Sequence, residues 1–206
     1  MNSMVHFSDC LNYLQTNYKT QSTIQSYITP TAYFTDAECD HICQIGYSSV
    51  LQPARVQNLN TGNKFVDPLS NGSNVSYIME DEFIYEKLRT LICKINADLY
   101  NFNLLDYGEP IKFAEYTTNG TSIHIDLGNN NSTNFRKLTV IILLSDPDDY
   151  DGGDFFITNH AGGSTMAPRE RGKVIIFPSF LMHYVSPITR GKRNTAVAFI
   201  YGPPFA

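Results

Sequence analysis

The chain has 206 residues, of which 42% are hydrophobic and 17% charged, a composition that suits one globular domain with a sizeable core. Its net charge of −5 gives no general attraction to phosphate backbones, so nucleic acid is not an expected partner. No apolar run approaches the roughly 20 residues of a membrane span, and residues 1–19 lack a signal-peptide core. We therefore expect a cytoplasmic protein with no membrane association and with reduced thiols.

The first half of the chain predicts helices and a few strands. Thr35 and Glu38 form the pattern of a capping box, and the apolar residues that follow recur at helical spacing. A second apolar pattern with steps of three and four predicts a longer helix, and both helices should pack on the outside of a sheet. In chain order we expect a helix near 7–14, a strand at 29–34, a helix at 36–47, a strand at 75–79 and a helix at 80–100.

Two other segments of this half invite a functional interpretation. Cys39, His41 and Cys43 suggest a zinc site, but the paired ligands of a closed site are absent, and thiols four residues apart on a helix favour core positions.

Residues 58–74 are rich in Gly, Asn, Asp and Pro and contain three large apolar side chains. A segment of this length without periodicity predicts a functional lid or a disordered loop.

From about residue 111 the pattern changes to short strands bounded by Gly, Asn, Asp and Pro. The fold class we predict is mainly β with flanking helices (α+β), built on a jelly-roll, or double-stranded β-helix, core. Residues 1–206 would form a single domain, with helices, strands and the lid in 1–110 and the core in 111–206. The core strands are expected at 111–117, 121–126, 137–144, 153–158, 173–178, 182–186 and 194–201.

His124, Asp126 and His183 are the candidate metal ligands and catalytic residues. Alternate side chains of a strand share one face, so His124 and Asp126 can point into a barrel together, and His183 can join them from a distant strand. Two imidazoles and one carboxylate leave three positions of an octahedral iron(II) open for a chelating co-substrate and dioxygen. Alone, a His-x-Asp tripeptide is a weak signal, because a surface strand with two polar side chains gives the same pattern.

The surrounding motifs make the signal specific. In order, the chain reads Leu-Ser-Asp-Pro at 144–147, Tyr-Asp-Gly-Gly at 150–153, Phe-Pro-Ser at 177–179, and a run from His183 to Arg193 that includes Pro187 and Gly191. With these motifs, residues 113–201 resemble the 2-oxoglutarate and iron(II)-dependent dioxygenases, in particular the prolyl 4-hydroxylase-like branch with the bacterial PKHD-type hydroxylases.

The resemblance implies roles for several residues. His124, Asp126 and His183 would hold Fe(II), and Arg193 would bind the distal carboxylate of 2-oxoglutarate, for which a planar, permanently charged guanidinium is suited. Arg190 and Lys192 are the local competitors for that carboxylate. Tyr116 would contact the co-substrate or the substrate, or else form an aromatic wall. Where some relatives have a second Tyr, this chain has aliphatic residues and Thr139, whose hydroxyl could bind 2-oxoglutarate instead.

The predicted activity is an Fe(II)/2-oxoglutarate-dependent hydroxylation of a proline in a peptide or protein, with O2 as oxidant, decarboxylation of 2-oxoglutarate to succinate, and ascorbate as a supporting reductant. One alternative is a jelly-roll module that binds metal without turnover. Others are an oxygenase acting on a small molecule or another side chain, and a cupin-type iron dioxygenase that uses no keto acid. The sequence does not determine the oligomeric state.

Overall fold

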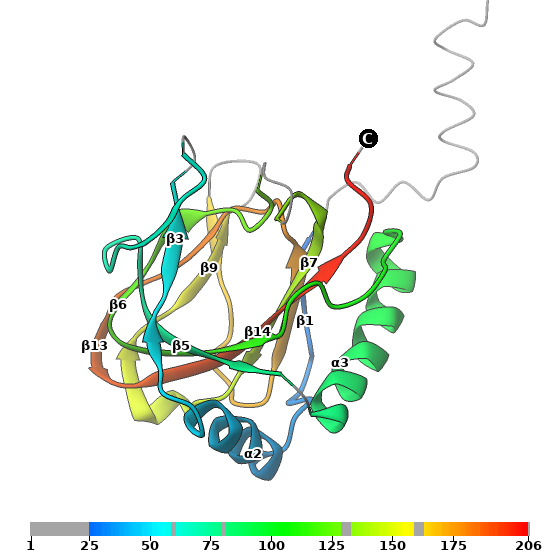
Figure 1. Cartoon of the computed structure of the whole chain (residues 1–206). Coiled ribbons are helices and arrows are strands. Elements are labelled where there is room, and N and C mark those ends of the chain that lie inside the picture. The colour runs from blue at the N-terminus through cyan, green and yellow to red at the C-terminus, as the bar shows by residue number, and fades with distance from the viewer. Residues whose placement is uncertain (1–24, 59–60, 80, 129–132, 159–162, 206) are drawn as a thin grey trace, which may run out of the picture.

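The computed structural model describes residues 25–58, 61–79, 81–128, 133–158 and 163–205. The helix expected near 7–14 lies outside this part of the chain. The described residues form an antiparallel sheet that curls into a barrel, with two helices packed on its outside (Figure 1). The helices are α2 (Asp36–Tyr47) and α3 (Glu82–Ile95), the latter continued by a π-helical turn (Asn96–Tyr100). No helix in the described part of the chain is long and apolar enough to cross a membrane.

The curled sheet joins its strands in the order β1-β11-β7-β14-β6-β12-β9-β10, with β5 and β2 branching from β6. Two small sheets, β13-β8 and the hairpin β3-β4, complete the described structure. The strands are β1 (Tyr27–Ile28), β2 (Gln52–Pro53), β3 (Arg55–Gln57), β4 (Lys64–Val66), β5 (Asn71–Ile78), β6 (Ile111–His124), β7 (Arg136–Leu143), β8 (Tyr150–Gly152), β9 (Phe155–Thr158), β10 (Ser164–Met166), β11 (Val174–Pro178), β12 (His183–Val185), β13 (Ile188–Gly191) and β14 (Arg193–Tyr201).

Strand β6 bends the sheet, because its two halves have different partners. The first half pairs with β5 on one side and β14 on the other, whereas the second half pairs with β12. Between the halves β6 bulges: Ser73 of β5 lies opposite Tyr116, but Asn71 already lies opposite Thr121. Gly120 in this bulge lies so close to the carbonyl of Val185 that a Cβ would be 1.9 Å from its oxygen. The absence of a side chain at Gly120 therefore allows β12 to approach β6.

The core has two layers, one on each face of the sheet. Along β7, Leu138, Val140 and Ile142 pack toward the helices, whereas Ile141 and Leu143 point into the barrel. Strand β14 divides in the same way, so both strands read as nearly continuous apolar runs. Because both faces are buried, these strands lack the polar alternation of a half-exposed sheet.

Most of the predicted elements within the described residues are confirmed, and five need correction. The strand expected at 29–34 is wrong, because the pairing is made by Tyr27 and Ile28 against β11, after which Pro30 offers no backbone N–H. The strand expected at 75–79 begins earlier, at Asn71, and the helix expected at 80–100 is α3 followed by a π-helical turn. The separate strands expected at 111–117 and 121–126 form the single strand β6, which ends at His124.

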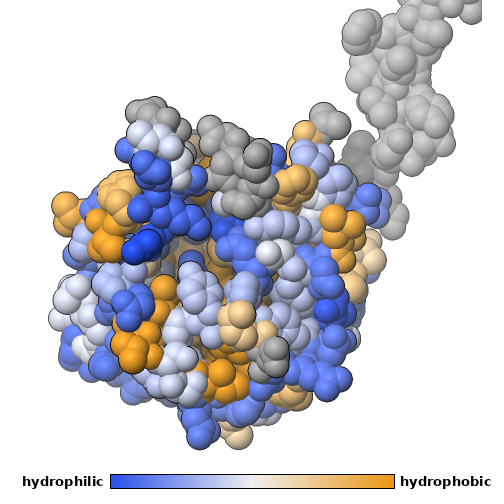
Figure 2. All heavy atoms as spheres, in the orientation of Figure 1, coloured by the Kyte–Doolittle hydropathy of each residue, from blue (hydrophilic) through white to orange (hydrophobic). Residues whose placement is uncertain are grey.

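The segment expected as a lid, 58–74, contains more regular structure than a loop. It holds strand β4, which pairs with β3 as a hairpin, and the beginning of β5. Phe65, Val66 and Leu69 are exposed on it. Figure 2 shows hydrophobic and hydrophilic side chains side by side over the region where Figure 1 draws this hairpin.

Helix α2 is held on the barrel at Gly46, and this contact generates a prediction. The Gly46 carbonyl accepts a hydrogen bond of 2.6 Å from Ser76 Oγ, and a Cβ at residue 46 would meet the ring of Phe113 at 2.3 Å. Gly46→Ala should lower the free energy of unfolding by about 1–3 kcal/mol, because the buried ring has no room to move, and this overlap outweighs the helix propensity of alanine. Urea denaturation would measure the change. Gln44→Ala on the exposed face of α2 is the control, and equal stability of the two variants would contradict the prediction.

Candidate metal centre

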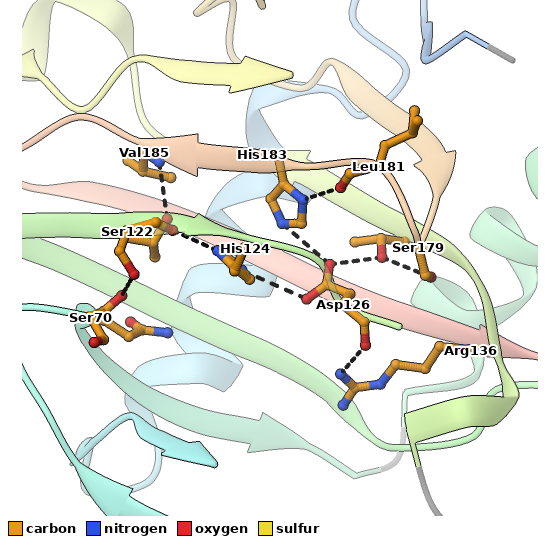
Figure 3. A network of polar contacts seen from close by, with 12 residues as sticks. Ser70, Ser122, His124, Asp126, Arg136, Ser179, Leu181, His183 and Val185 are labelled. Carbon is orange, nitrogen blue, oxygen red and sulfur yellow. Dashed lines mark hydrogen bonds and ion pairs between the residues drawn. The ribbon is translucent and has the colours of Figure 1, made fainter. Parts of the chain in front are cut away.

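The structure brings His124, Asp126 and His183 together at one end of the barrel interior. His124 ends β6 and lies directly opposite His183 of β12. Nε2 of His183 is 3.3 Å from Asp126 Oδ2, and Nε2 of His124 is 3.8 Å from Asp126 Oδ1. Figure 3 shows both rings pointing toward the carboxylate. One potential ligand atom from each residue lies within 4.8 Å of the others, so a single cation can be bound by all three.

Both imidazoles are oriented by backbone carbonyls. Nδ1 of His124 is 2.7 Å from the carbonyl oxygen of Ser122, and Nδ1 of His183 is 2.9 Å from that of Leu181. A carbonyl oxygen only accepts hydrogen bonds, so each Nδ1 carries the proton and each Nε2 keeps its lone pair. This is the tautomer in which a histidine coordinates a metal through Nε2.

Asp126 reaches the site from a loop, which differs from the prediction that it shares a strand with His124. The carbonyl of Ser179 accepts hydrogen bonds from the N–H groups of Asp126 and Leu127, at 2.9 and 2.8 Å. Arg136 Nη1 donates to the Asp126 carbonyl at 3.1 Å. The loop is therefore fixed by two main-chain hydrogen bonds and one side-chain hydrogen bond where strand pairing has ended. Figure 3 draws the last of these, from Arg136.

The carboxylate of Asp126 is oriented by a hydroxyl pair. Thr139 Oγ1 donates to Asp126 Oδ2 at 2.9 Å and lies 3.0 Å from Ser179 Oγ. The side chains of Thr139 and Ser179 are almost fully buried. Thr139, predicted to contact 2-oxoglutarate, thus contacts the carboxylate of Asp126, a candidate metal ligand, and its contact with the co-substrate stays a prediction.

The surroundings favour an ionised carboxylate at Asp126 and a neutral imidazole at His183. Burial raises the pKa of Asp126, but His183, His124, Arg136 and Lys112 together lower it below its usual value. Burial also lowers the pKa of His183, against the opposing effect of Asp126. These are the protonation states that a divalent cation requires of its ligands.

Arg193 lies at the other end of the same pocket. It faces Tyr116 across the β14–β6 pairing, and only 3% of it is exposed. Its guanidinium carbon is 5.4 Å from the centroid of the Tyr116 ring, and it forms no ion pair with any acidic side chain of the described residues. Burial raises the pKa of the Tyr116 hydroxyl, against the effect of Arg193, so this hydroxyl is a neutral donor at physiological pH.

The two competitors of Arg193 point away from the pocket. Lys192 Nζ is 3.0 Å from Glu115 Oε2 on the outer face of the sheet, and Arg190 Nε is 2.7 Å from Asp151 Oδ2 at the surface. Because side chains alternate along a strand, only Arg193 of the pair 192–193 faces inward. The pocket opens to solvent, and about 440 Å³ of space lies inside it and at its mouth. Its apolar walls include Ile141, Phe155, Val185, Val197 and Phe199.

Sequence reasoning missed three residues of this site. Ser179 belongs to the Phe-Pro-Ser motif, yet nothing in the motif shows that its carbonyl holds the Asp126 loop. Arg136 offers no signal, because its contact depends on the loop geometry. Lys112 could have been noticed, since it shares the inward face of β6 with Tyr116 and is a charged residue on a buried face.

The three residues that suggested a zinc site lie in different surroundings. Cys39 is fully buried in the core, Cys43 is partly buried, and Nε2 of His41 is 2.9 Å from Asp81 Oδ2 at the surface. Asp81 caps the first turn of α3, so His41 connects the two helices. These contacts support the interpretation of the two thiols as core residues.

Comparison with known proteins agrees with this geometry. The model of the 2OG-Fe(II) oxygenase superfamily matches residues 111–201. This match covers 91 of the 206 residues, so the chain is similar to that superfamily over strands β6 to β14. A PKHD-type hydroxylase of Caulobacter sp. (strain K31) is 32% identical over 94 residues, which are 46% of this chain and 40% of that protein. The first three such relatives are matched over 40 to 59% of their length, so the chain spans about half of the curated relatives that it matches.

Solved structures confirm the fold. A prolyl-4-hydroxylase of Pseudomonas putida superposes with a TM-score of 0.68 at 16% identity, covering 94% of this chain and 97% of that one. A prolyl hydroxylase of Trichoplax adhaerens, solved with a peptide fragment of hypoxia inducible factor, gives 0.70 at 18% identity, covering 93% and 86%. The predicted jelly-roll core is thereby confirmed.

The residues present fit the metal and the co-substrate that this superfamily uses, iron(II) and 2-oxoglutarate, with O2 as the oxidant. Two imidazole nitrogens and one carboxylate are the donor set of a non-haem iron site. A buried guanidinium without an acidic partner is costly unless an anion joins it, and a dicarboxylate supplies one. The metal and co-substrate residues predicted from the sequence therefore line one pocket.

The contact of Thr139 with Asp126 generates a testable prediction. Thr139→Val removes the donor to Asp126 Oδ2, so the affinity for Mn(II), used as a stand-in for iron(II), should fall by about tenfold or more. Titration followed by electron paramagnetic resonance would measure it. Thr195→Val removes a hydroxyl from the same pocket wall without any hydrogen bond to the triad and should bind Mn(II) as the parent does. Equal affinities of the two variants would show that the Thr139 hydroxyl does not support the ligand.

The burial of the Cys39 thiol generates a second testable prediction, which concerns its reactivity. Burial raises its pKa to about 11, against the opposing charge of Arg171. At pH 8 only about one Cys39 in a thousand would be a thiolate, so iodoacetamide should label exposed Cys93 and leave Cys39 unmodified until the protein is unfolded. Peptide mass spectrometry would locate the label. Rapid labelling of Cys39 in the folded protein would contradict the prediction.

Proposed function

We propose that this chain is an Fe(II)/2-oxoglutarate-dependent hydroxylase that acts on a proline residue in a peptide or protein. The observation that carries the oxygenase part is that one pocket holds both the His124–Asp126–His183 triad and the buried guanidinium of Arg193, which forms no ion pair with the described residues. A module that only bound metal would have no use for a buried cation at the far end of the same cavity. An iron dioxygenase without a keto acid would not need it either.

The chain's own residues would prepare the reaction. His124, Asp126 and His183 would hold iron(II), and Arg193 would bind the distal carboxylate of 2-oxoglutarate beside the Tyr116 hydroxyl. When bound, iron, 2-oxoglutarate and O2 supply the oxidising chemistry, in which the keto acid becomes succinate and CO2 and one oxygen atom enters a C–H bond. The hydroxyls of Thr139 and Ser179 keep the carboxylate of Asp126 oriented. The apolar walls exclude water that would compete for the site.

The assignment of the substrate depends on likeness and on the surface near the metal. The relatives are PKHD-type hydroxylases, and one structural neighbour is a prolyl hydroxylase with a bound peptide. In this chain the connection between β4 and β5 is joined to strand β6, because Ser122 N donates to Ser70 O at 2.9 Å. Exposed Phe65, Val66 and Leu69 on or beside the β3–β4 hairpin could cover an extended peptide.

The described helices share one core with the barrel, which supports treating residues 1–206 as a single domain.

Succinate formation tests the oxygenase part. The protein with iron(II), ascorbate, 2-oxoglutarate and a panel of proline-containing peptides should produce succinate, and mass spectrometry should find peptides heavier by one oxygen. Asp126→Ala should abolish both products, because one of the three metal ligands is lost. Asp148→Ala removes an exposed carboxylate and should leave both unchanged. Succinate without any hydroxylated peptide would reject proline and keep the oxygenase, whereas no succinate at all would reject the oxygenase.

A further inference from the structure

A lysine in the pocket has no place in the function proposed so far. Alternation along β6 puts Lys112, Ala114 and Tyr116 on one face, and Lys112 lines the pocket together with Asp126 and Thr139. Its ammonium is 5.5 Å from the centroid of the Phe199 ring. The Lys112 side chain forms no hydrogen bond or ion pair with the residues that the structure describes. Most lysines avoid such positions, because burying an unpaired charge is costly.

Lys112 and Arg193 lie at different ends of the pocket. Lys112 pairs with Val197 and Tyr116 with Arg193, so the two cations start four residues apart along the ladder, about 13 Å at 3.3 Å per residue. Thr139, which contacts Asp126, pairs with Phe199 of β14. Lys112 pairs with Val197, two residues from Phe199, whereas Arg193 lies six residues from Phe199 on the same strand. Lys112 is therefore the cation nearer the triad, and Arg193 is the cation at the far end.

Protein carboxylates near Lys112 are already engaged. Asp126 belongs to the metal triad, and Glu109 Oε1 accepts hydrogen bonds from Arg136 Nε at 2.8 Å and from the Tyr201 hydroxyl at 2.9 Å. Burial lowers the pKa of Lys112, because a charge is costly among the apolar walls of this pocket. A ligand carboxylate at the metal end would relieve that cost and would form a charge-assisted hydrogen bond.

We propose that Lys112 is a second carboxylate-binding residue, which holds the C1 carboxylate at the keto-acid end of 2-oxoglutarate while Arg193 holds the C5 carboxylate. This inference rests on the proposed function, because it assumes that 2-oxoglutarate occupies the pocket. Two cations at opposite ends of one cavity match the two negative ends of a dicarboxylate. The flexible stem of lysine allows its ammonium to follow a carboxylate that is also bound to the metal.

Two ligands and two variants separate the roles of the cations. 2-Oxoglutarate has both carboxylates, whereas 2-oxovalerate has the same chain length and the keto acid but no C5 carboxylate. Calorimetric titration into Mn(II)-saturated protein should show that Lys112→Met weakens binding of both ligands by a similar factor, about tenfold. Arg193→Met should weaken 2-oxoglutarate only. Lys112→Arg keeps the charge and should bind both ligands more tightly than Lys112→Met.

Lys94→Met is the matched control, because it removes the same charge from the exposed side of α3 and should leave both affinities unchanged. Thermal unfolding and Mn(II) titration of each variant would show that the fold and the metal site are intact, and Lys112→Gln gives a second neutral variant should Lys112→Met fold poorly. Parent-like binding of 2-oxovalerate by both neutral variants would overturn the role of Lys112 alone. No binding of 2-oxoglutarate to the unaltered protein would overturn the proposed function itself.

Discussion

The bend in β6 is the constraint on which the site depends. One strand serves two parts of the curled sheet, and its change of partner at the bulge between Tyr116 and Thr121 places β12 beside its last residues. Only then do His124 and His183 become cross-strand neighbours whose Nε2 atoms face the same point. A straight β6 would keep β14 as its partner to the end and would leave His183 in a separate layer. The metal centre is therefore a product of sheet curvature, and Gly120 is the residue that makes the close approach possible.

Much of this arrangement could be predicted from the sequence, because the relevant patterns are local. Apolar periodicity locates α2 and most barrel strands, and strand alternation decides that Arg193, not Lys192, faces inward. The errors concern tertiary pairing. Whether residues 29–34 or 27–28 pair with β11 depends on where Pro30 falls relative to the neighbouring strand, and whether 111–126 is one strand or two depends on a bulge that only its partners define.

The grouping of the candidate ligands in one pocket was predictable, whereas the contacts that support them were less so. His124, Asp126, His183 and Arg193 are marked by residue type and spacing, because metal and carboxylate chemistry permits few alternatives. The supporting contacts follow from backbone geometry: a carbonyl at Ser179, a guanidinium reaching from Arg136, and a hydroxyl at Thr139 that turned out to face the metal ligand. Lys112 was predictable only in part. The sequence shows a charged residue on a face expected to be buried, but it does not show how near that residue lies to the candidate metal ligands.

The loop that carries Asp126 lies outside the strand pairing of β6. The position of the carboxylate and the pairing of the strands therefore depend on different contacts. The ladder of β6 ends at His124, before the carboxylate, and the Asp126 loop is held by Ser179 and Arg136 instead. Strand pairing thus places the two nitrogen donors of the candidate site, whereas contacts outside that pairing place its oxygen donor. The geometry of one centre therefore depends on two separate parts of the fold.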